Sequence, residues 1–319
     1  MQTYLDFEKP VAELESKIAE LKSLSSTDEG LSIDEEVSRL SQRAEEALAD
    51  IYRKLTPWQK TQVARHPQRP HFSDYVGKLI TEWTPLAGDR KFGEDAALLA
   101  GFGRFDGQPV AILGQEKGSS TETRLRHNFG MAKPEGYRKA VRVMDMADRF
   151  SIPVISFVDT SGAYPGIDAE ARGQAEAIAR STEKSLDLGV PNLAIIIGEG
   201  GSGGAIAIAT ANRVLMLEHA IYAVASPEAS ASILWKDAGK AQDAATSMKI
   251  TAQDLLGFGV IDAIIPEPVG GAHRHPEVVM ESARTAIGEF LSSFAGNRGR
   301  LEIREHRREK FLAIGSALG

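Results

Sequence analysis

Apolar positions along the first 85 residues predict helices. Phe7, Val11 and Leu14 begin a series at spacings of four and three, which places its members on one helix face. After a polar break at 25–30, Ser32 and Glu35 have the spacing of a capping box. A second stripe follows: Ile33, Val37, Leu40, Ala44, Ala47, Ile51 and Leu55. Two such helices joined by a short loop predict an antiparallel hairpin.

From about residue 88 the pattern changes to strands alternating with helices. Apolar segments at 96–105 and 109–115 flank a turn and predict a β-hairpin, and a helix is expected from Pro134 to about Phe150. Three units then repeat the order apolar run, small-residue turn, helix; they span 153–185, 193–211 and 220–235.

This repeat predicts an α/β fold with a largely parallel sheet, whose functional residues gather where strands end and helices begin. The segment after Pro276 again has a helical pattern. We therefore divide the chain into an N-terminal helical region (1–85), an α/β core (86–275) and a C-terminal helical segment (276–319).

Composition narrows the class of protein. Of 319 residues, 42% are hydrophobic and 25% are charged, as in ordinary globular proteins. No run approaches the roughly 18 apolar residues of a membrane span, and the N-terminus lacks a signal-peptide pattern, so a cytoplasmic location is expected. The absence of cysteine excludes disulfides and cysteine-based zinc sites, and a net charge of −7 argues against nucleic-acid binding.

Five glycines in the seven positions 198–204 form the most distinctive motif, and a dinucleotide fingerprint is one interpretation of it. Gly198, Gly200 and Gly203 have the required spacing, and Glu218 lies where a ribose-binding acid is expected. However, the following helix is short, and the motif lies past mid-chain. An NAD-dependent enzyme therefore stays open as the alternative function.

A nucleophile elbow is the second interpretation, because Asp262 and His273 follow Ser202 in the chain order of a catalytic triad. An elbow places its serine about two residues after the strand. The apolar run stops at Ile197, five residues earlier, which argues against a serine nucleophile.

An oxyanion hole made of backbone N–H groups is the third interpretation, and the sequence favours it. Glycine permits unusual backbone angles and close ligand approach, and a helix N-terminus exposes free N–H groups. Such a site stabilises developing negative charge on an oxygen without needing a strong side-chain base.

Motifs spread along nearly the whole chain then identify a family. The sequence resembles the carboxyltransferase α subunits of bacterial acetyl-CoA carboxylase. The matching stretches are LDFEKPVAELESKI (5–18), ARHPQRP (64–70), RHNFGMAKPEGYRKAVRVM (126–144), DTSGAYPG (159–166), IIGEGGSGGAIAI (196–208), SPEASASILWK (226–236) and IIPEPVGGAHR (264–274). Ser161 stands where the family usually has proline, and Ala229-Ser230 where it usually has Gly-Cys.

The resemblance implies a crotonase-like fold, a spiral of ββα units, with the N-terminal hairpin and C-terminal helices as additions. It implies transfer of a carboxyl group from carboxybiotin, attached to the biotin carboxyl carrier protein, to acetyl-CoA, which gives malonyl-CoA for fatty-acid synthesis. The implied partners are a β subunit in an α2β2 assembly, the carrier protein and biotin carboxylase. Zinc is expected only in the β subunit, and no metal in this chain.

By match to the family's motif, the N–H groups of Gly203 and Gly204 form the biotin-side oxyanion hole. The remaining implied residues on the carboxybiotin side are Gly200, Gly201, Ser202, Gly162, Ala163 and Tyr164. Two other features are expected to be structural more than functional: His273 and His275, as loop residues, and two sets of basic residues. These sets are Lys117, Arg124, Arg126, His127, Arg138, Lys139 and Arg142, and, near the C-terminus, Arg298, Arg300, Arg304, Arg307, Arg308 and Lys310.

Overall fold

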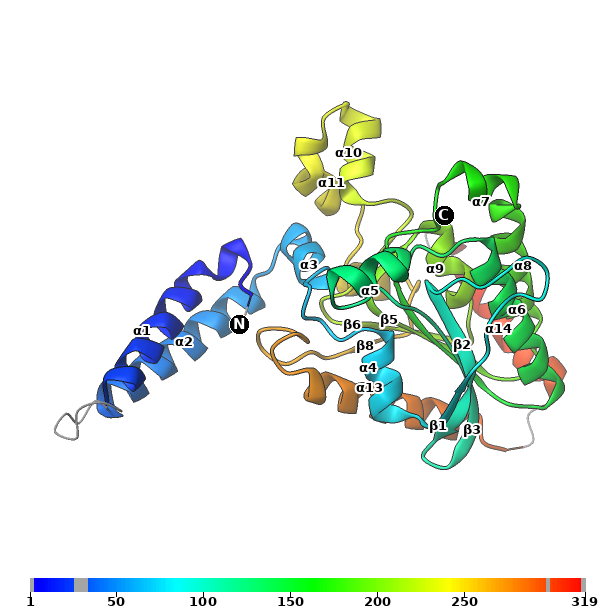
Figure 1. The fold of residues 1–319 in the computed structure, drawn as a ribbon, viewed down its shortest axis with the longest axis horizontal. Helices are drawn as coiled ribbons and strands as arrows, with labels where there is room; N and C mark the ends of the chain where they lie inside the picture. The colour runs from blue at the N-terminus through cyan, green and yellow to red at the C-terminus, as the bar shows by residue number, and fades with distance from the viewer. Residues whose placement is uncertain (1–2, 26–33, 297–298, 317–319) are drawn as a thin grey trace.

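The computed structural model describes residues 3–25, 34–296 and 299–316. The predicted N-terminal hairpin is present: α1 (Lys9–Ser25) packs against α2 (Asp34–Arg53) and extends away from the body of the molecule (Figure 1). Val11 of α1 and Leu48 and Tyr52 of α2 are buried between these helices and the short helix α3 (Pro57–Ala64). The expected capping box at Ser32 lies outside the described residues.

One mixed sheet forms the centre of the fold. Its strand order is β1-β2-β3-β4-β5-β6-β8, and β7 also pairs with β5. The strands are β1 (Thr81–Pro85), β2 (Leu98–Phe105), β3 (Gln108–Gln115), β4 (Val154–Thr160), β5 (Asn192–Gly201), β6 (Arg213–Leu217), β7 (Ile221–Ala223) and β8 (Ala263–Ile265). The pairs β1–β2 and β2–β3 are antiparallel, and all later pairs are parallel.

Helices follow the strands in the predicted order. Their bounds are α3 (Pro57–Ala64), α4 (Phe72–Leu79), α5 (Thr121–Arg126), α6 (Pro134–Arg149), α7 (Ile167–Ala171), α8 (Gln174–Asp187), α9 (Ser202–Ala209), α10 (Pro227–Trp235), α11 (Ala241–Ser247), α12 (Ala252–Gly257), α13 (Pro276–Ser293) and α14 (Arg300–Ala313). Helices α6, α8 and α14 pack together, α4 packs on α13, and α10 with α11 stands apart from the sheet (Figure 1).

Two expectations about elements were wrong in detail. The first 85 residues are not all helical, because β1 pairs with β2 at the edge of the sheet. Also, β5 does not end at Ile197 but continues to Gly201, because its glycine-rich end pairs with β7. The expected C-terminal helices are α13 and α14.

The central strands are buried on both faces, which explains their continuous apolar runs. Every residue of β4 and β5 is buried. Their carboxyl ends therefore lie in a rigid setting, and the two turns that follow them are fixed by the core beneath.

Candidate active site at the ends of β4 and β5

The two predicted turns lie side by side. Strands β4 and β5 are parallel neighbours, and Thr160 at the end of β4 is paired with Gly200 near the end of β5. The turn 161–166 follows β4, and helix α9 begins at Ser202 directly after β5. All eight residues expected at the site belong to these two adjacent segments.

Close packing between the turns requires glycine at two of these positions. A Cβ atom on Gly201 would overlap the carbonyl of Ser161, and one on Gly204 would lie 2.7 Å from the backbone nitrogen of Ala163. Real Cβ atoms essentially never come so near to backbone atoms. Gly203 is different, because its Cβ would make only an ordinary contact, 3.4 Å from the Ile178 side chain.

The N-terminus of α9 directs backbone donors toward the neighbouring turn. Gly203 and Gly204 are among the first residues of the helix, whose N–H groups have no partner within the helix. The carbonyl oxygen of Gly204 accepts a hydrogen bond from Nε2 of Gln115, 3.0 Å away. This end of the helix carries the positive end of the helix dipole, so it favours negative charge on a ligand atom.

Hydrogen bonds hold the first turn in shape. Thr160 Oγ1 donates to the carbonyl of Gly162 (2.8 Å) and accepts from its N–H (3.1 Å). The backbone of Tyr164 donates to Ala132 (3.0 Å) and accepts from Gln174 Nε2 (2.8 Å). The turn is therefore fixed by its own strand end and by the segments around it.

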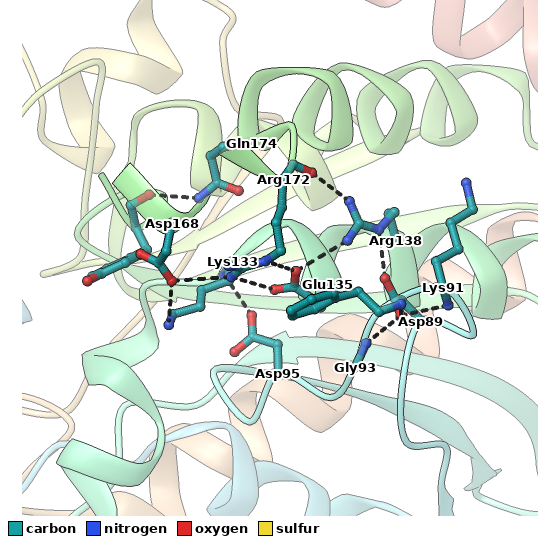
Figure 2. A network of polar contacts seen from close by, with 12 residues as sticks. Asp89, Lys91, Gly93, Asp95, Lys133, Glu135, Arg138, Asp168, Arg172 and Gln174 are labelled. Carbon is teal, nitrogen blue, oxygen red and sulfur yellow. Dashed lines mark hydrogen bonds and ion pairs between the residues drawn. The ribbon is translucent and has the colours of Figure 1, made fainter. Parts of the chain in front are cut away.

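A polar network outside the turn supports this arrangement (Figure 2). At its centre the buried Glu135 accepts from Arg172 (2.6 Å) and from Arg138 (3.3 Å), and Arg138 also donates to Asp89 (2.7 Å). The ammonium of Lys133 lies 4.8 Å from the centre of the Tyr164 ring. The network thus joins α6 and α8 to the turn that carries Tyr164.

Beneath the glycine segment lies an ion cluster that the sequence did not predict. Lys117 Nζ lies 2.8 Å from Asp159 Oδ1 and 3.3 Å from Glu199 Oε2. Arg65 Nη2 lies 2.7 Å from Glu199 Oε1, and its Nη1 lies 2.6 Å from Glu228 Oε1. The cluster joins the ends of β3, β4 and β5 to α3 and α10.

Charge pairing decides the protonation states in this cluster. Burial alone would raise the pKa of Asp159, but Lys117 and His71 hold it well below its usual range. Burial alone would lower the pKa of Lys117, but Asp159 and Glu199 outweigh it and raise this pKa. Both shifts favour the charged forms of Asp159 and Lys117 at neutral pH.

A cavity of about 240 Å³ adjoins the cluster. Its lining includes Arg65 and Lys117 of the cluster and also Ser161, which lies in the first turn. His71 also lines it: Nδ1 lies 3.4 Å from Asp159 Oδ2, and Nε2 has no hydrogen-bond partner within the described part of the chain. The cavity provides space beside the two turns. It does not add a new acid–base pair, because the carboxylates of the cluster already have cationic partners.

Most of the central basic residues are paired within the chain. Arg138 binds Asp89 and Glu135, Lys139 binds Glu94, and Arg142 donates to the Ala87 carbonyl. The C-terminal set is also engaged: Arg300, Arg304 and Lys310 pair with Asp148, Asp187 and Asp262, and Arg307 is fully buried. Arg298 lies outside the described residues.

The serine-nucleophile interpretation fails, although for another reason than the sequence suggested. Ser202 does follow its strand directly and has a φ of 51°. The other two triad candidates are engaged elsewhere: His273 stacks on His66 with ring centres 3.8 Å apart, and Asp262 pairs with Lys310. Neither of the two predicted partners therefore forms a triad with Ser202.

The dinucleotide interpretation receives no support either. Gly198 and Gly200 are strand residues of β5, not residues of a phosphate-binding turn. Glu218, the expected ribose ligand, accepts the backbone N–H of Glu267 at 3.1 Å. The described residues contain no group of three His, Cys, Asp or Glu side chains that could hold a metal ion.

A family model and whole-length relatives match this chain. The model described as "Acetyl co-enzyme A carboxylase carboxyltransferase-like" matches residues 4–315. A protein of Methylobacterium sp. (strain 4-46) is 68% identical over the full length of both chains. One of Nitrobacter winogradskyi is also 68% identical, over all of this chain and 99% of its own. Both carry the name acetyl-coenzyme A carboxylase carboxyl transferase subunit alpha.

Solved structures show the same fold at low sequence identity. Transcarboxylase 12S has a TM-score of 0.60 at 18% identity, over 75% of this chain and 45% of its own. A Pseudomonas malonate decarboxylase hetero-tetramer with coenzyme A has a TM-score of 0.57 at 19% identity, over 72% and 92%. The expected crotonase-like fold is thus confirmed. With relatives matched over its full length, the chain belongs to the carboxyltransferase α-subunit family of acetyl-CoA carboxylase.

Proposed function

We propose that this chain, together with a β subunit, moves the carboxyl group of carrier-bound carboxybiotin to acetyl-CoA and so forms malonyl-CoA. The observation that carries the proposal is the pair of N–H groups at Gly203 and Gly204, at the start of α9 beside the turn 162–164. Biotin carboxylase would supply the carboxylated carrier. The same proposal places the reaction in the cytoplasm. It keeps the division of the chain into three parts, with the first boundary moved to before β1 because this strand belongs to the sheet.

The chain's share of the chemistry is electrostatic. Carboxybiotin would supply the carboxyl group and afterwards a basic nitrogen for the methyl proton of acetyl-CoA. The N–H groups of Gly203 and Gly204 would donate to the biotin ureido oxygen, on which negative charge develops as the carboxyl group leaves. Donors fixed in advance by the packing of the two turns lower the barrier, because they need no reorganisation during the reaction.

The same arrangement gives each remaining site residue a task. Gly201 lets β5 approach the first turn closely, and Gly200 lets it lie against the Tyr222 ring. Ser202, with positive φ, turns the chain from the strand into α9. Gly162, Ala163 and Tyr164 would form the opposite wall of the carboxybiotin site. Ser161, where the family usually has proline, leaves this wall in place because hydrogen bonds from Thr160 define the turn.

A groove beside α9 is the surface that we assign to the β subunit. It has a volume of about 490 Å³ and is lined mostly by apolar residues, among them Ile206 of α9, Tyr222, Val224 and Leu255. Val224 is 78% exposed. A subunit seated there would contact Ile206 of α9 and Tyr222 of β7, whose ring lies against Gly200 at the end of β5.

The pair Gly203→Pro and Gly203→Ala tests the oxyanion hole. Proline removes the N–H, whereas alanine keeps it and meets only the Ile178 side chain at 3.4 Å. In steady-state assays with the β subunit, we expect the proline variant to lose about 10²–10³-fold in kcat and the alanine variant to lose less than about threefold. A proline variant that assembles and keeps full turnover would contradict the assignment.

A further inference from the structure

We propose that Lys117 is a positioning residue for the oxyanion hole: its ammonium, held between Asp159 and Glu199, fixes the end of β4 against the end of β5 and so sets the direction of the N–H groups of α9. This inference rests on the function proposed above. It adds a role for a partly buried cation that lies outside the two glycine turns.

The geometry ties the cluster to both turns. Asp159 lies two residues before Ser161, and Glu199 lies three residues before Ser202. Asp159 Oδ1 accepts two hydrogen bonds, from Lys117 and from the backbone N–H of Glu199 at 2.9 Å. A change in the lysine therefore acts on the carboxylate that holds the backbone of β5, three residues before α9 begins.

The lysine also closes a gap that the strands leave open. Between β4 and β5 the register shifts between Val158 and Thr160, so regular pairing is interrupted at the level of Asp159. The side chains of Asp159, Lys117 and Glu199 bridge this interruption. The relative placement of the two turns thus depends on ion pairs at the position where backbone pairing fails.

A purely stabilising role is the competing explanation, because breaking any buried ion pair destabilises a fold. Lys139 provides a matched control. It too is an ion-paired lysine, more deeply buried than Lys117: its Nζ donates to the Asp95 carbonyl at 2.8 Å, and it pairs with Glu94. It lies on α6 and contacts neither glycine turn.

The experiment compares Lys117→Met, Lys117→Arg and Lys139→Met as full-length chains assembled with the β subunit. Unfolding midpoints are measured together with kcat and KM for carboxyl transfer from malonyl-CoA to free biotin. Misplacement of catalytic groups by about 1 Å costs about 10²-fold in rate. We therefore expect Lys117→Met to lose about 10²-fold in kcat with KM within about threefold, and Lys117→Arg to recover at least about tenfold of this loss.

We expect Lys139→Met to lower the unfolding midpoint and keep kcat within about twofold. The inference is overturned if Lys117→Met keeps wild-type kcat, or if Lys139→Met loses as much. Should Lys117→Met fail to fold, Glu199→Gln replaces it: a kcat loss of at least about tenfold is expected, and wild-type kcat overturns the inference. If instead the wild-type assembly is inactive, the proposed function fails, which is a separate result.

Discussion

At the scale of single residues, the site depends on glycines, because these residues have no side chain. Gly201 and Gly204 allow the end of β5 and the start of α9 to lie directly against the backbone of residues 161–163. Any larger residue would push the two turns apart. Gly203, although next to Gly204, faces a flexible side chain and carries no such restriction.

The substitutions Gly204→Ala and Gly203→Ala make this difference measurable. We expect Gly204→Ala to lower the free energy of unfolding by about 1–3 kcal/mol, the usual cost of overpacking. Gly203→Ala should change it by less than about 1 kcal/mol, because alanine favours helix and its Cβ has room. Urea unfolding of both variants checks the prediction, and equal effects at the two positions would contradict it.

The sequence predicted the backbone part of the proposed site but not the ion cluster beside it. Glycine clusters after apolar runs are visible in one short window, so residues 198–204 and 162–164 could be proposed as candidates. Lys117 contacts residues 42 and 82 positions further along the chain, Asp159 and Glu199. No spacing rule connects such distant positions, because the sheet alone brings them together.

At the scale of elements, polar contacts between residues far apart in the sequence hold segments that lie outside the sheet. Arg69, in the connection between α3 and α4, pairs with Glu267, which follows β8, and both side chains are buried; Nη1 lies 2.8 Å from Oε2. Glu267 also accepts the backbone N–H groups of His219 (2.9 Å) and Ala272 (2.7 Å). One carboxylate therefore holds three segments in place.

This carboxylate predicts a pH dependence of stability. Burial alone would raise the pKa of Glu267, but Arg69 outweighs it and lowers the pKa to about 2. A carboxylate whose pKa is lowered in the folded state stabilises the fold at pH values above its pKa in the unfolded chain, about 4.3. This contribution is lost as the pH falls toward 2. A difference of roughly two units corresponds to about 3 kcal/mol.

The variant Glu267→Gln tests this dependence. We expect it to be less stable than the wild type by about 3 kcal/mol at pH 6, with a deficit that shrinks as the pH falls from 5 to 3. Urea titrations at several pH values give both curves. A deficit that is the same at pH 6 and pH 3 would show that the carboxylate charge does not stabilise the fold.

Element types followed from the sequence more reliably than element ends. The hairpin β2–β3 and helix α6 were predicted nearly to the residue, because turn and proline signals are local. The end of β5 and the whole of β1 were missed. Both owe their strand structure to neighbours, β7 and β2, and not to an apolar pattern of their own.

At the scale of the whole molecule, two pairs of helices project from the body of the protein. These are the α1–α2 hairpin and the α10–α11 pair (Figure 1). The apolar groove beside α9 is likewise open, and its lining residue Tyr222 lies against Gly200. Searched across the described residues, no helix has the length and apolar character needed to cross a membrane.

The groove predicts how assembly can be weakened. Val224→Asp places a charge on its exposed wall, so we expect the dissociation constant of the β subunit to rise at least about tenfold. Leu312→Asp on α14 is the control, because Leu312 is similarly exposed (69%) but lies outside the groove. Titration by analytical ultracentrifugation measures both variants, and equal affinities would exclude the groove as the contact surface.

The most direct test of the whole account is carboxyl transfer from malonyl-CoA to free biotin, measured with this chain alone, with the β subunit alone and with the mixture. We predict turnover only in the mixture, because the N–H groups of Gly203 and Gly204 supply one part of a shared site. Turnover by this chain alone would contradict the shared site. A stable mixture without turnover would contradict the carboxyltransferase function itself.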